Sequence, residues 1–416
     1  MAGGELPAEV AQRLAAAPDL DLLLVVLTYQ HAATAGGLVR ALGKAVHTHF
    51  PDAHPLILHW DAGSTDGTPE AVAQAAGEAP VLSLADRVAA PRALTASHPV
   101  PGVDLAFRLV CRVVRATGVR AVGLIGADLR GVPEEWVERL LRPVWAGELD
   151  LVAPVFARHV LDGTVTSCLL YPLTRALYGG SVRHLVAPEL GLGRELVLRL
   201  DAAPGWGTAA SRPLPLFLTT TAAGLGARLG ECALGPREAE PGELRHDLGA
   251  IMSEVVGAAF ALAELHEEGW RERGPAPSPV QLGAPAFTAS EVSPASRARM
   301  VAAFRQGLRD LQPIWEQALS PNTLADLYAL GDLAPDEFGF SAELWARVVV
   351  DVLLAYRFRV LHRDHLLRSL VPLYFGRLAG LCREAAGLPA VAQERLLERQ
   401  AQAFERAKPD LIDRWR

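Results

Sequence analysis

Short aliphatic runs alternate with helical stretches along the first half of the chain. Aliphatic runs without polar alternation are typical of strands that are buried on both faces of a sheet. The strands predicted in this way cover residues 22–27, 56–58, 81–84, 119–125 and 149–155. The helices predicted between them cover residues 37–50, 68–76, 104–117 and a segment that opens at Pro133. Alternation of this kind predicts an α/β fold with helices against a sheet.

The last third of the chain has a different pattern. From residue 293 on, apolar residues recur at spacings of three and four, which predicts amphipathic helices. One such set is Val301, Phe304, Leu308, Leu311 and Trp315, and another is Leu344, Val348, Asp351, Leu354 and Phe358, which contains one acid. Residues 271–292 carry several Pro, Gly, Ser and Ala residues without periodicity, which is typical of a linker.

These patterns predict four consecutive segments. The segments are an N-terminal extension over residues 1–20, an α/β domain over 21–270, the linker over 271–292 and a helical C-terminal subdomain over 293–416. A helix over residues 248–270 would close the α/β domain. The C-terminal helices need a partner for their apolar faces, so we expect them to pack on the α/β domain or on a second copy in a homodimer.

Turn-forming residues follow the second predicted strand, with the sequence D-A-G-S-T-D-G-T over residues 61–68. Such small and polar residues let the backbone bend tightly. Thr68 suits the N-cap of a helix, Pro69 its first position and Glu70 its first turn. A strand, turn and helix in this order place the turn at the carboxyl edge of the sheet, where α/β proteins bind ligands.

Charge and cysteine usage narrow the class of protein. The formal net charge of −7 and the isoelectric point near 6.0 argue against nucleic-acid binding, which usually needs a basic face. The cysteines lack C-x-x-C spacing, so we expect buried free thiols in a reducing compartment. The N-terminus lacks the pattern of a signal peptide, and no apolar run is expected to span a bilayer. We therefore expect a cytoplasmic protein.

Three motifs resemble a known group of enzymes. The turn over residues 61–68 resembles the D-x-G-S-x-D-G-T turn of family-two-like glycosyltransferases. R-H-V-L-D-G-T over residues 158–164 and Y-P-L-T-R-A-L-Y-G over 171–179 are similar to segments of glucosylglycerate, mannosylglycerate and glucosyl-3-phosphoglycerate synthases. The resemblance covers about residues 20–270. It implies a GT-A-like, Rossmann-type mixed sheet flanked by helices, and a retaining transfer of sugar to glycerate or its phosphate.

The resemblance also implies roles for particular residues. Asp61 and Ser64 would contact the nucleoside, and Tyr29 would line the base pocket. The residues expected to bind the nucleotide sugar are Tyr29, Asp61, Ser64, Gly102, Asp128 and Arg130. The alternative for the turn is an ordinary strand-to-helix connection without a ligand. The alternative for Tyr29 is an aromatic side chain packed on a helix.

The motif over residues 158–164 implies where the sugar acceptor would bind. Arg158, His159 and Thr164 lie in a polar loop that would bind a small carboxylate, because arginine suits bidentate contacts with carboxylates. Glu189 stands where the family has the aspartate of G-G-D-F-G, so it joins Asp128 and Arg158 as a candidate catalytic residue. The alternative is a surface loop held by Asp162, with a structural role for His159.

Four positions depart from the family's catalytic motifs. They are Val103 for a phosphate-binding lysine, Gly126 for the first carboxylate of D-x-D, Pro215 for an acid in a strand expected at residues 213–220, and Ala239 for a metal-binding histidine. Asp128 alone offers an incomplete shell for Mg²⁺ or Mn²⁺, which prefer several oxygen ligands. His246 could replace the missing histidine if its loop shifted. Otherwise it begins a helix.

Two functions remain open. The first is a glycosyltransferase that passes a sugar from a nucleoside-diphosphate sugar to a small hydroxy acid such as glycerate, with retention. Arg130, Arg158 or Arg212 would then stabilise the leaving diphosphate in place of a metal. The second is a catalytically inactive homologue that acts as a sugar-nucleotide sensor or partner subunit. Both need Asp61 and Asp128 to lie at one edge of the sheet.

Overall fold

The chain forms two compact units in a computed structural model that describes residues 6–77, 79–85, 100–205, 213–237, 247–288, 293–334 and 336–416. The first unit comprises Met1–Phe156, Val186–Arg245 and Pro279–Pro285, and the second Ala157–Leu185, His246–Ser278 and Ala286–Arg416. The units interleave along the sequence, whereas consecutive segments were predicted. Residues 157–185 and 246–278 belong with the C-terminal helices because their own helices pack against them.

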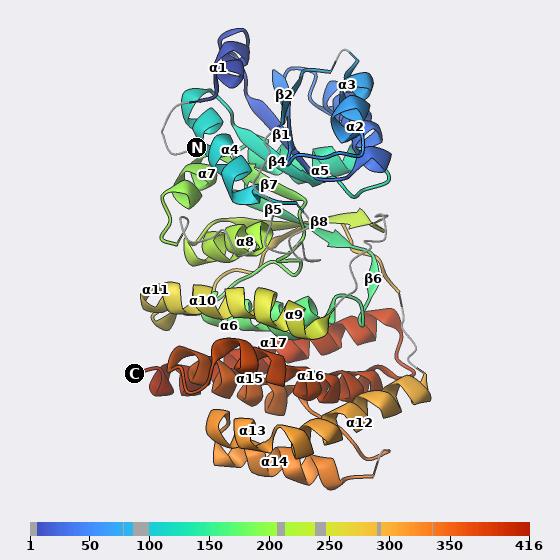
Figure 1. Cartoon of the computed structure of the whole chain (residues 1–416), viewed down its shortest axis with the longest axis vertical. Helices are drawn as coiled ribbons and strands as arrows, with labels where there is room; N and C mark the ends of the chain where they lie inside the picture. The colour runs from blue at the N-terminus through green and yellow to red at the C-terminus, as the bar shows by residue number, and fades with distance from the viewer. Residues whose placement is uncertain are drawn as a thin grey trace. The chain divides into compact units, whose positions relative to one another are not determined.

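The described residues of the first unit form an eight-stranded sheet with the order β3-β2-β1-β4-β7-β5-β8-β9 (Figure 1). Strand β7 runs antiparallel to its neighbours β4 and β5, and the other pairs are parallel. The strands are β1 Leu22–Thr28, β2 Pro55–Asp61, β3 Val81–Ala85, β4 Ala121–Gly126, β5 Leu151–Phe156, β7 Leu190–Gly193, β8 Leu229–Gly235 and β9 Val280–Leu282. This sheet confirms the predicted mixed α/β class.

Helices flank the sheet in two groups, seen on either side of the strands in Figure 1. Helix α2 packs on α3 and α5, and α7 packs on α4 and α8. The helices of this unit are α1 Ala8–Ala15, α2 Ala32–His49, α3 Thr68–Ala76, α4 Val103–Ala116, α5 Glu134–Trp145, α7 Arg194–Asp201 and α8 Leu214–Gly224. The packing buries both faces of the central strands, which is why β1 is a continuous aliphatic run.

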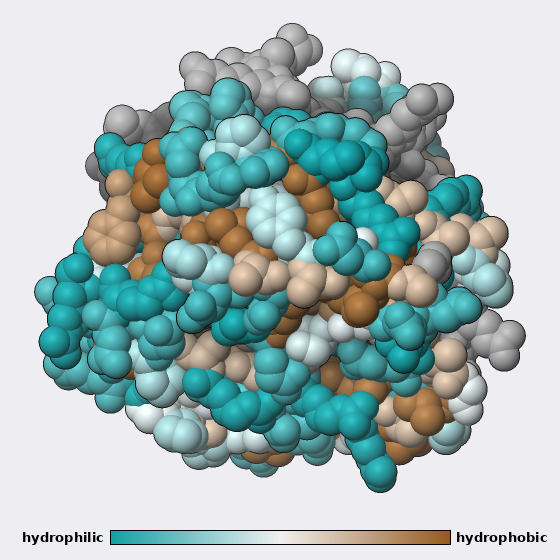
Figure 2. Space-filling view, turned by 90° about the horizontal axis from the view of Figure 1, so that it is seen from below, coloured by the Kyte–Doolittle hydropathy of each residue, from teal (hydrophilic) through white to brown (hydrophobic). Residues whose placement is uncertain are grey.

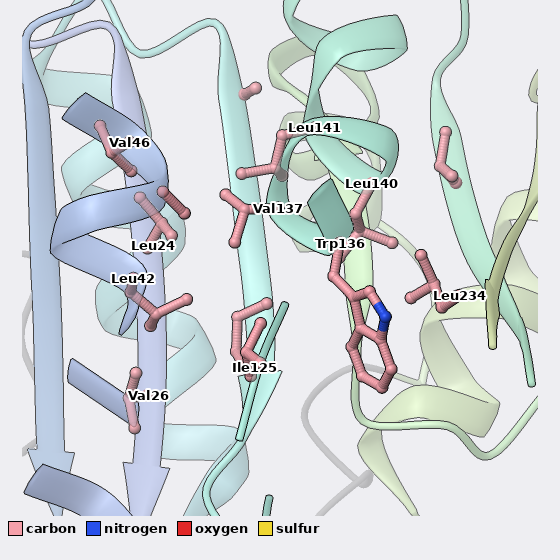
Figure 3. Close-up of a cluster of buried hydrophobic side chains, with 14 of the residues drawn as sticks. Leu24, Val26, Leu42, Val46, Ile125, Trp136, Val137, Leu140, Leu141 and Leu234 are labelled. Atoms are coloured by element: carbon pink, nitrogen blue, oxygen red, sulfur yellow. The ribbon is translucent and has the colours of Figure 1, made fainter. Parts of the chain in front are cut away.

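One core joins β1 to α2 and α5 (Figure 3). Leu24 and Val26 of β1 contribute to it together with Leu42 of α2 and Val137 and Leu141 of α5. These side chains are nearly inaccessible to solvent. Burial of such side chains, worth about 1.5–3 kcal/mol each, fixes the helices relative to the strands whose ends carry the candidate site.

The strand expected at residues 213–220 is wrong, because this segment begins helix α8. Its apolar and threonine residues suit a strand by composition, but a helix buried on all sides shows the same pattern. Pro215 lies in the first turn of the helix, where its missing N–H costs nothing. The Thr219 hydroxyl donates to the Pro215 carbonyl oxygen at 2.9 Å.

The described part of the second unit is mainly helical, as predicted for the C-terminal region. Its α-helices are α6 Tyr171–Tyr178, α9 Leu248–Ile251, α10 Gly257–Leu265, α11 Glu267–Arg271, α12 Pro294–Asp310, α13 Gln312–Ala318, α14 Pro321–Asp332, α15 Ala342–Arg357, α16 Arg363–Ala385 and α17 Ala390–Arg414. Two short strands, β6 Arg158–His159 and β10 Phe287–Thr288, pair in parallel. The segment predicted as a linker therefore carries both β9 and β10.

A buried acid explains the interrupted apolar face of α15. Asp351 accepts a hydrogen bond from the backbone N–H of Ser320 at 2.9 Å and pairs with the Arg414 guanidinium at 2.6 Å. Buried carboxylates persist in proteins when they are paired in this way. Phe358 was expected on the same face, but it follows the end of α15 and is 51% exposed.

One helical stretch of the described residues, Leu248–Leu265, is long and apolar enough to cross a membrane. The prediction that no run reaches this length is therefore wrong. Half of the stretch is buried inside the protein, and buried core helices pass the same test, so the finding is weak evidence for a membrane span. All four cysteines are buried free thiols, as predicted.

Figure 2 shows one face of the protein, on which hydrophobic residues lie in separate patches between hydrophilic ones. The large hydrophobic residues most exposed among those described include Val280, Phe358 and Val391. Single exposed apolar side chains are ordinary on protein surfaces. The homodimer stays a prediction.

Gly191→Ala is predicted to destabilise the protein by about 1–3 kcal/mol. A Cβ at this position in β7 would clash with the backbone oxygen of Leu140, so α5 would have to move away from the sheet. Gly193→Ala is the matched control, because its Cβ would come no closer than 3.5 Å to the Asp150 oxygen. Urea unfolding of both variants measures the effect. Equal losses of stability would contradict the prediction.

Candidate functional site

The ends of three neighbouring strands bring the candidate residues to one edge of the sheet. β1 pairs in parallel with β2 and with β4, and the register places Thr28 beside Asp61 and Leu27 beside Gly126. Asp61 closes β2, and Asp128 follows β4 by two residues. The two aspartates therefore leave the sheet at the same carboxyl edge, as both functional hypotheses require.

His31 lies within electrostatic reach of both aspartates. Burial lowers the pKa of its imidazole, while the carboxylates of Asp128, Asp66 and Asp61 act in the opposite direction. Its Nδ1 accepts a hydrogen bond from the backbone N–H of Tyr29 at 3.0 Å. The neutral ring therefore carries its proton on Nε2. His31 was not among the predicted site residues.

The carboxylate of Asp61 is held inside its own turn and is 1% exposed. It accepts hydrogen bonds from the backbone N–H groups of Gly63 at 3.1 Å and Ser64 at 2.8 Å. The Ser64 and Thr28 hydroxyls donate to its Oδ1 at 2.6 and 2.8 Å. Gly63, with a φ of 90°, gives the backbone the left-handed bend that this arrangement needs. Asp61 thus determines the shape of the turn.

The same turn holds the loop that connects β1 to α2. The Gln30 N–H donates to Ser64 Oγ at 2.9 Å, and the Gln30 side chain pairs with Thr65 at 2.9 and 3.1 Å. Asp66 accepts from the Ala32 N–H at 2.9 Å, at the start of α2. The connection explains why α2 begins at Ala32, five residues before the predicted start. It also fixes Tyr29 and His31 relative to the turn.

A chain of hydrogen bonds leads from Asp61 through the buried Thr28 and His59 to the exposed Ser83. His59 is fully buried, and its Nε2 lies 2.8 Å from Thr28 Oγ1. Its Nδ1 lies 2.6 Å from Ser83 Oγ. Because Thr28 donates to Asp61, a neutral His59 with the proton on Nε2 satisfies every contact. Burial lowers the pKa of His59 to about 4, so the ring is neutral at physiological pH.

A charged cluster occupies the space between β4, β7 and β8. Arg237, two residues after β8, donates to Asp128 through Nη1 at 3.0 Å and Nη2 at 2.8 Å. It also donates to Glu189 Oε1 through Nη2 at 2.9 Å and Nε at 3.3 Å. The guanidinium carbon lies 5.9 Å from the ring centroid of Phe156. Burial alone would lower the pKa of Arg237, but the two carboxylates outweigh it and keep the guanidinium charged.

Glu189 is the most buried member of this cluster, with 1% of its surface exposed. Burial raises the pKa of its carboxyl, although the neighbouring Arg237 opposes the shift. Its Oε2 is buried and has no hydrogen-bond partner among the described residues. The position follows from the sheet, because β7 runs antiparallel beside β4 and Glu189 comes directly before it.

The residues present do not fit a divalent cation. Asp128 offers both of its oxygens to Arg237, and Gly126 supplies no ligand. In the part of the chain that the structure describes, no group of three or more His, Cys, Asp or Glu side chains could hold a metal ion. Arg212 and His246, which were considered as replacements for missing family residues, lie outside the described residues, as does Ala239.

The remaining predicted site residues are divided between the two units. In the first, Gly102 precedes α4 with a φ of 66°, and Arg130 is exposed. In the second, Arg158 and His159 form β6, and the buried Thr164 hydroxyl hydrogen-bonds to the Tyr374 hydroxyl. The acceptor-binding roles of Arg158, His159 and Thr164 stay predictions, as does the nucleotide-binding role of Tyr29.

Arg237, like His31, is a site residue that sequence reasoning missed. A signal was present, because L-G-P-R over residues 234–237 resembles the family's L-G-x-K, with the basic residue at the same place. What the motif could not show is that β8 and β4 are separated only by β5 and β7, so that Arg237 reaches Asp128 across the strand ends.

Comparisons with known proteins find likeness in solved structures alone. No family model matches the chain, and no curated protein matches it. It is similar to glucosyl-3-phosphoglycerate synthase from Mycobacterium tuberculosis in complex with Mn²⁺, UDP-glucose and phosphoglyceric acid, with 21% identity over 63% of this chain and 86% of that one, at a TM-score of 0.41. A mycobacterial protein has 22% identity over 63% and 80%, with a TM-score of 0.41.

The same synthase in complex with Mg²⁺ and UDP has 18% identity over 62% of this chain and 83% of that one, with a TM-score of 0.38. At these values the likeness carries no argument about substrate or mechanism.

Lowering the pH from about 7.5 to about 5 is predicted to cost about 2 kcal/mol of stability through His59. The pKa of His59 is about 4 in the folded protein, below its ordinary value of 6.5. The unfolded state therefore binds the proton first, and stability is lost as the pH falls through this window. Urea unfolding of the wild type and of His59→Gln at both pH values isolates the effect. Parallel losses in the two proteins would contradict it.

Proposed function

We propose that the carboxyl edge of the sheet binds a nucleoside-diphosphate sugar and that the protein is a glycosyltransferase, which transfers the sugar to a small hydroxy acid such as glycerate. The observation that carries the proposal is the meeting of the 61–68 turn and Asp128 at one sheet edge, with His31 in reach of both. The three motifs similar to those of glycerate-modifying glycosyltransferases support it.

In this proposal the nucleoside lies beside the turn that Asp61 shapes and beside Tyr29. The diphosphate lies toward Asp128, where the Arg237 guanidinium is the positive charge fixed by the sheet. Charge develops on the diphosphate as the bond to the sugar breaks, and a cation held in place stabilises it without reorganisation. The acceptor hydroxyl then attacks the sugar, with retention as the proposed stereochemical outcome.

A catalytically inactive homologue that senses a sugar nucleotide is the second candidate. One observation favours it: the side chains of Asp128, Glu189 and Arg237 are committed to one another. Such a protein keeps the nucleotide-binding turn but does not turn the sugar over. Fold alone does not separate the two functions, since function depends on the site.

Calorimetric titration with UDP-, GDP- and ADP-glucose is predicted to reveal binding of one of them to the wild type. Asp128→Ala should weaken that binding about tenfold or more, because it removes the predicted contact of Asp128 with the nucleotide sugar and leaves the guanidinium of Arg237 held by Glu189 alone. Asp150→Ala is the matched control, an aspartate of the same unit that precedes β5 and pairs with Arg228. Because β5 is parallel to β4, Asp150 lies at the opposite edge of the sheet, and its loss should leave binding unchanged.

An assay of sugar transfer distinguishes the glycosyltransferase from the inactive sensor. The glycosyltransferase releases nucleoside diphosphate when glycerate or 3-phosphoglycerate is added, and chromatography of the products measures it. Binding without release of diphosphate with either acceptor favours the sensor. Failure of every nucleotide sugar to bind would refute both.

A further inference from the structure

We infer that the guanidinium of Arg237 takes the place of the divalent cation at this site. It fills the space between Asp128 and Glu189 and compensates their charge, so the protein takes up no Mn²⁺ there. As a consequence, which rests on the proposed function, a nucleoside diphosphate binds without a metal ion.

The contacts of Arg237 show how it compensates the charges of Asp128 and Glu189. A divalent cation would be held by several oxygen ligands such as carboxylates, and its charge would offset their repulsion. Here one guanidinium makes a two-pronged contact with Asp128 and a second contact with Glu189, at 2.8–3.0 Å for the three shortest bonds. Paired, charge-assisted hydrogen bonds of this kind are among the strongest available to a side chain. A metal ion would have to break them before it could bind either carboxylate.

The surroundings of Gly126 show how closely the cluster packs against this residue. A Cβ on this residue would lie 2.6 Å from Glu189 Oε1 and 2.9 Å from Asp128 Oδ1. It would also lie 3.1 Å from Nη2 of Arg237. Contacts below 3.0 Å force a neighbour to move, so a side chain here would displace the carboxylate oxygens of Glu189 and Asp128, which are the ends of flexible side chains. The glycine at position 126 therefore leaves room for the contacts that Arg237 makes with Asp128 and Glu189.

The guanidinium keeps some capacity for a ligand. Its Nε–H, one Nη1–H and both hydrogens of Nη2 account for the four contacts with carboxylates. Arginine has five N–H donors, so one Nη1–H remains outside these contacts. The Asp128 side chain is 36% exposed, so this end of the cluster is open to solvent. In the inferred complex, a phosphate oxygen accepts a hydrogen bond from this donor.

Electron paramagnetic resonance of Mn²⁺ tests the metal part of the inference. The wild type is expected to bind no Mn²⁺ at Asp128 up to about 1 mM, the weak end of divalent-cation sites in proteins. Gly126→Asp/Arg237→Met, which adds a carboxylate and removes the guanidinium, is expected to gain one bound Mn²⁺ per chain. Adding Asp128→Asn to that variant should abolish it. Gly126→Asp alone should gain none.

Mn²⁺ bound by the wild type and lost in Asp128→Asn would overturn the inference. The wild-type measurement decides this point even if the multiple variants fold poorly. Arg228→Met is the matched arginine control, because Arg228 forms an exposed ion pair with Asp150 at the other edge of the sheet. It should bind Mn²⁺ no better than the wild type.

Calorimetry with UDP, with EDTA or with Mn²⁺, tests the nucleotide part. The wild-type Kd should agree within about twofold in the two conditions, whereas Arg237→Met should bind about tenfold more weakly in EDTA. Arg237→Lys, which keeps the charge without the fork, should lie between them. UDP binding to the wild type that needs Mn²⁺ would overturn the inference and leave the proposed function intact. If UDP binds in neither condition, the proposed function is contradicted for a uridine nucleotide. The Mn²⁺ resonance measurement would still decide whether Arg237 takes the place of the metal ion.

Discussion

The fork of Arg237 between Asp128 and Glu189 is the interaction on which the candidate site depends. Each of the three residues belongs to a different strand end, so their contacts tie β4, β7 and β8 together. A buried glutamate without a partner would be costly, and an arginine removed from water needs carboxylates in return. The cluster therefore stabilises the fold as well as forming the candidate site. The loss of any one of the three side chains would leave the others with an unpaired charge or an unused hydrogen-bonding group.

The turn after β2 likewise has both a structural role and a predicted binding role. Its sequence resembles a nucleotide-sugar motif, yet Asp61, Ser64 and Asp66 are engaged in hydrogen bonds that shape the turn and hold the loop before α2. A ligand at this edge would thus meet a preformed surface whose polar side chains are oriented by one another. Preorganised sites lose little entropy when they bind.

Much of the fold was predictable because the strands are buried on both faces. An uninterrupted aliphatic run as short as residues 22–27, followed by turn-forming residues, is typical of a buried strand, and the structure confirms β1. The strand expected at residues 213–220 came from the family resemblance, and the composition gave no sign against it, because a helix buried on all sides has the same composition as a strand. The buried acid of α15 could be noticed in the sequence, but its partners at Ser320 and Arg414 are set by packing between distant helices.

The site was predictable only in part, for a related reason. Motifs reveal which residue types lie next to each strand, and they singled out Asp61, Asp128 and Glu189 as candidates. The order of strands in the sheet is a nonlocal property, however, and it alone brings Arg237 to Asp128. Sequence reasoning therefore considered Gly126 by itself, whereas in the structure it lies against the cluster of Asp128, Glu189 and Arg237.

The interleaving of the two units has a consequence for how the chain folds as it is made. The first unit needs β9, at Val280–Leu282, before β8 gains its outer neighbour. In a nascent chain that has emerged only to residue 270, the edge of the sheet would be the seven-residue β8 and not the three-residue β9, and longer exposed edge strands invite pairing with other chains. Cutting the gene at a single point would likewise release neither unit intact, because each draws on three separate stretches of sequence.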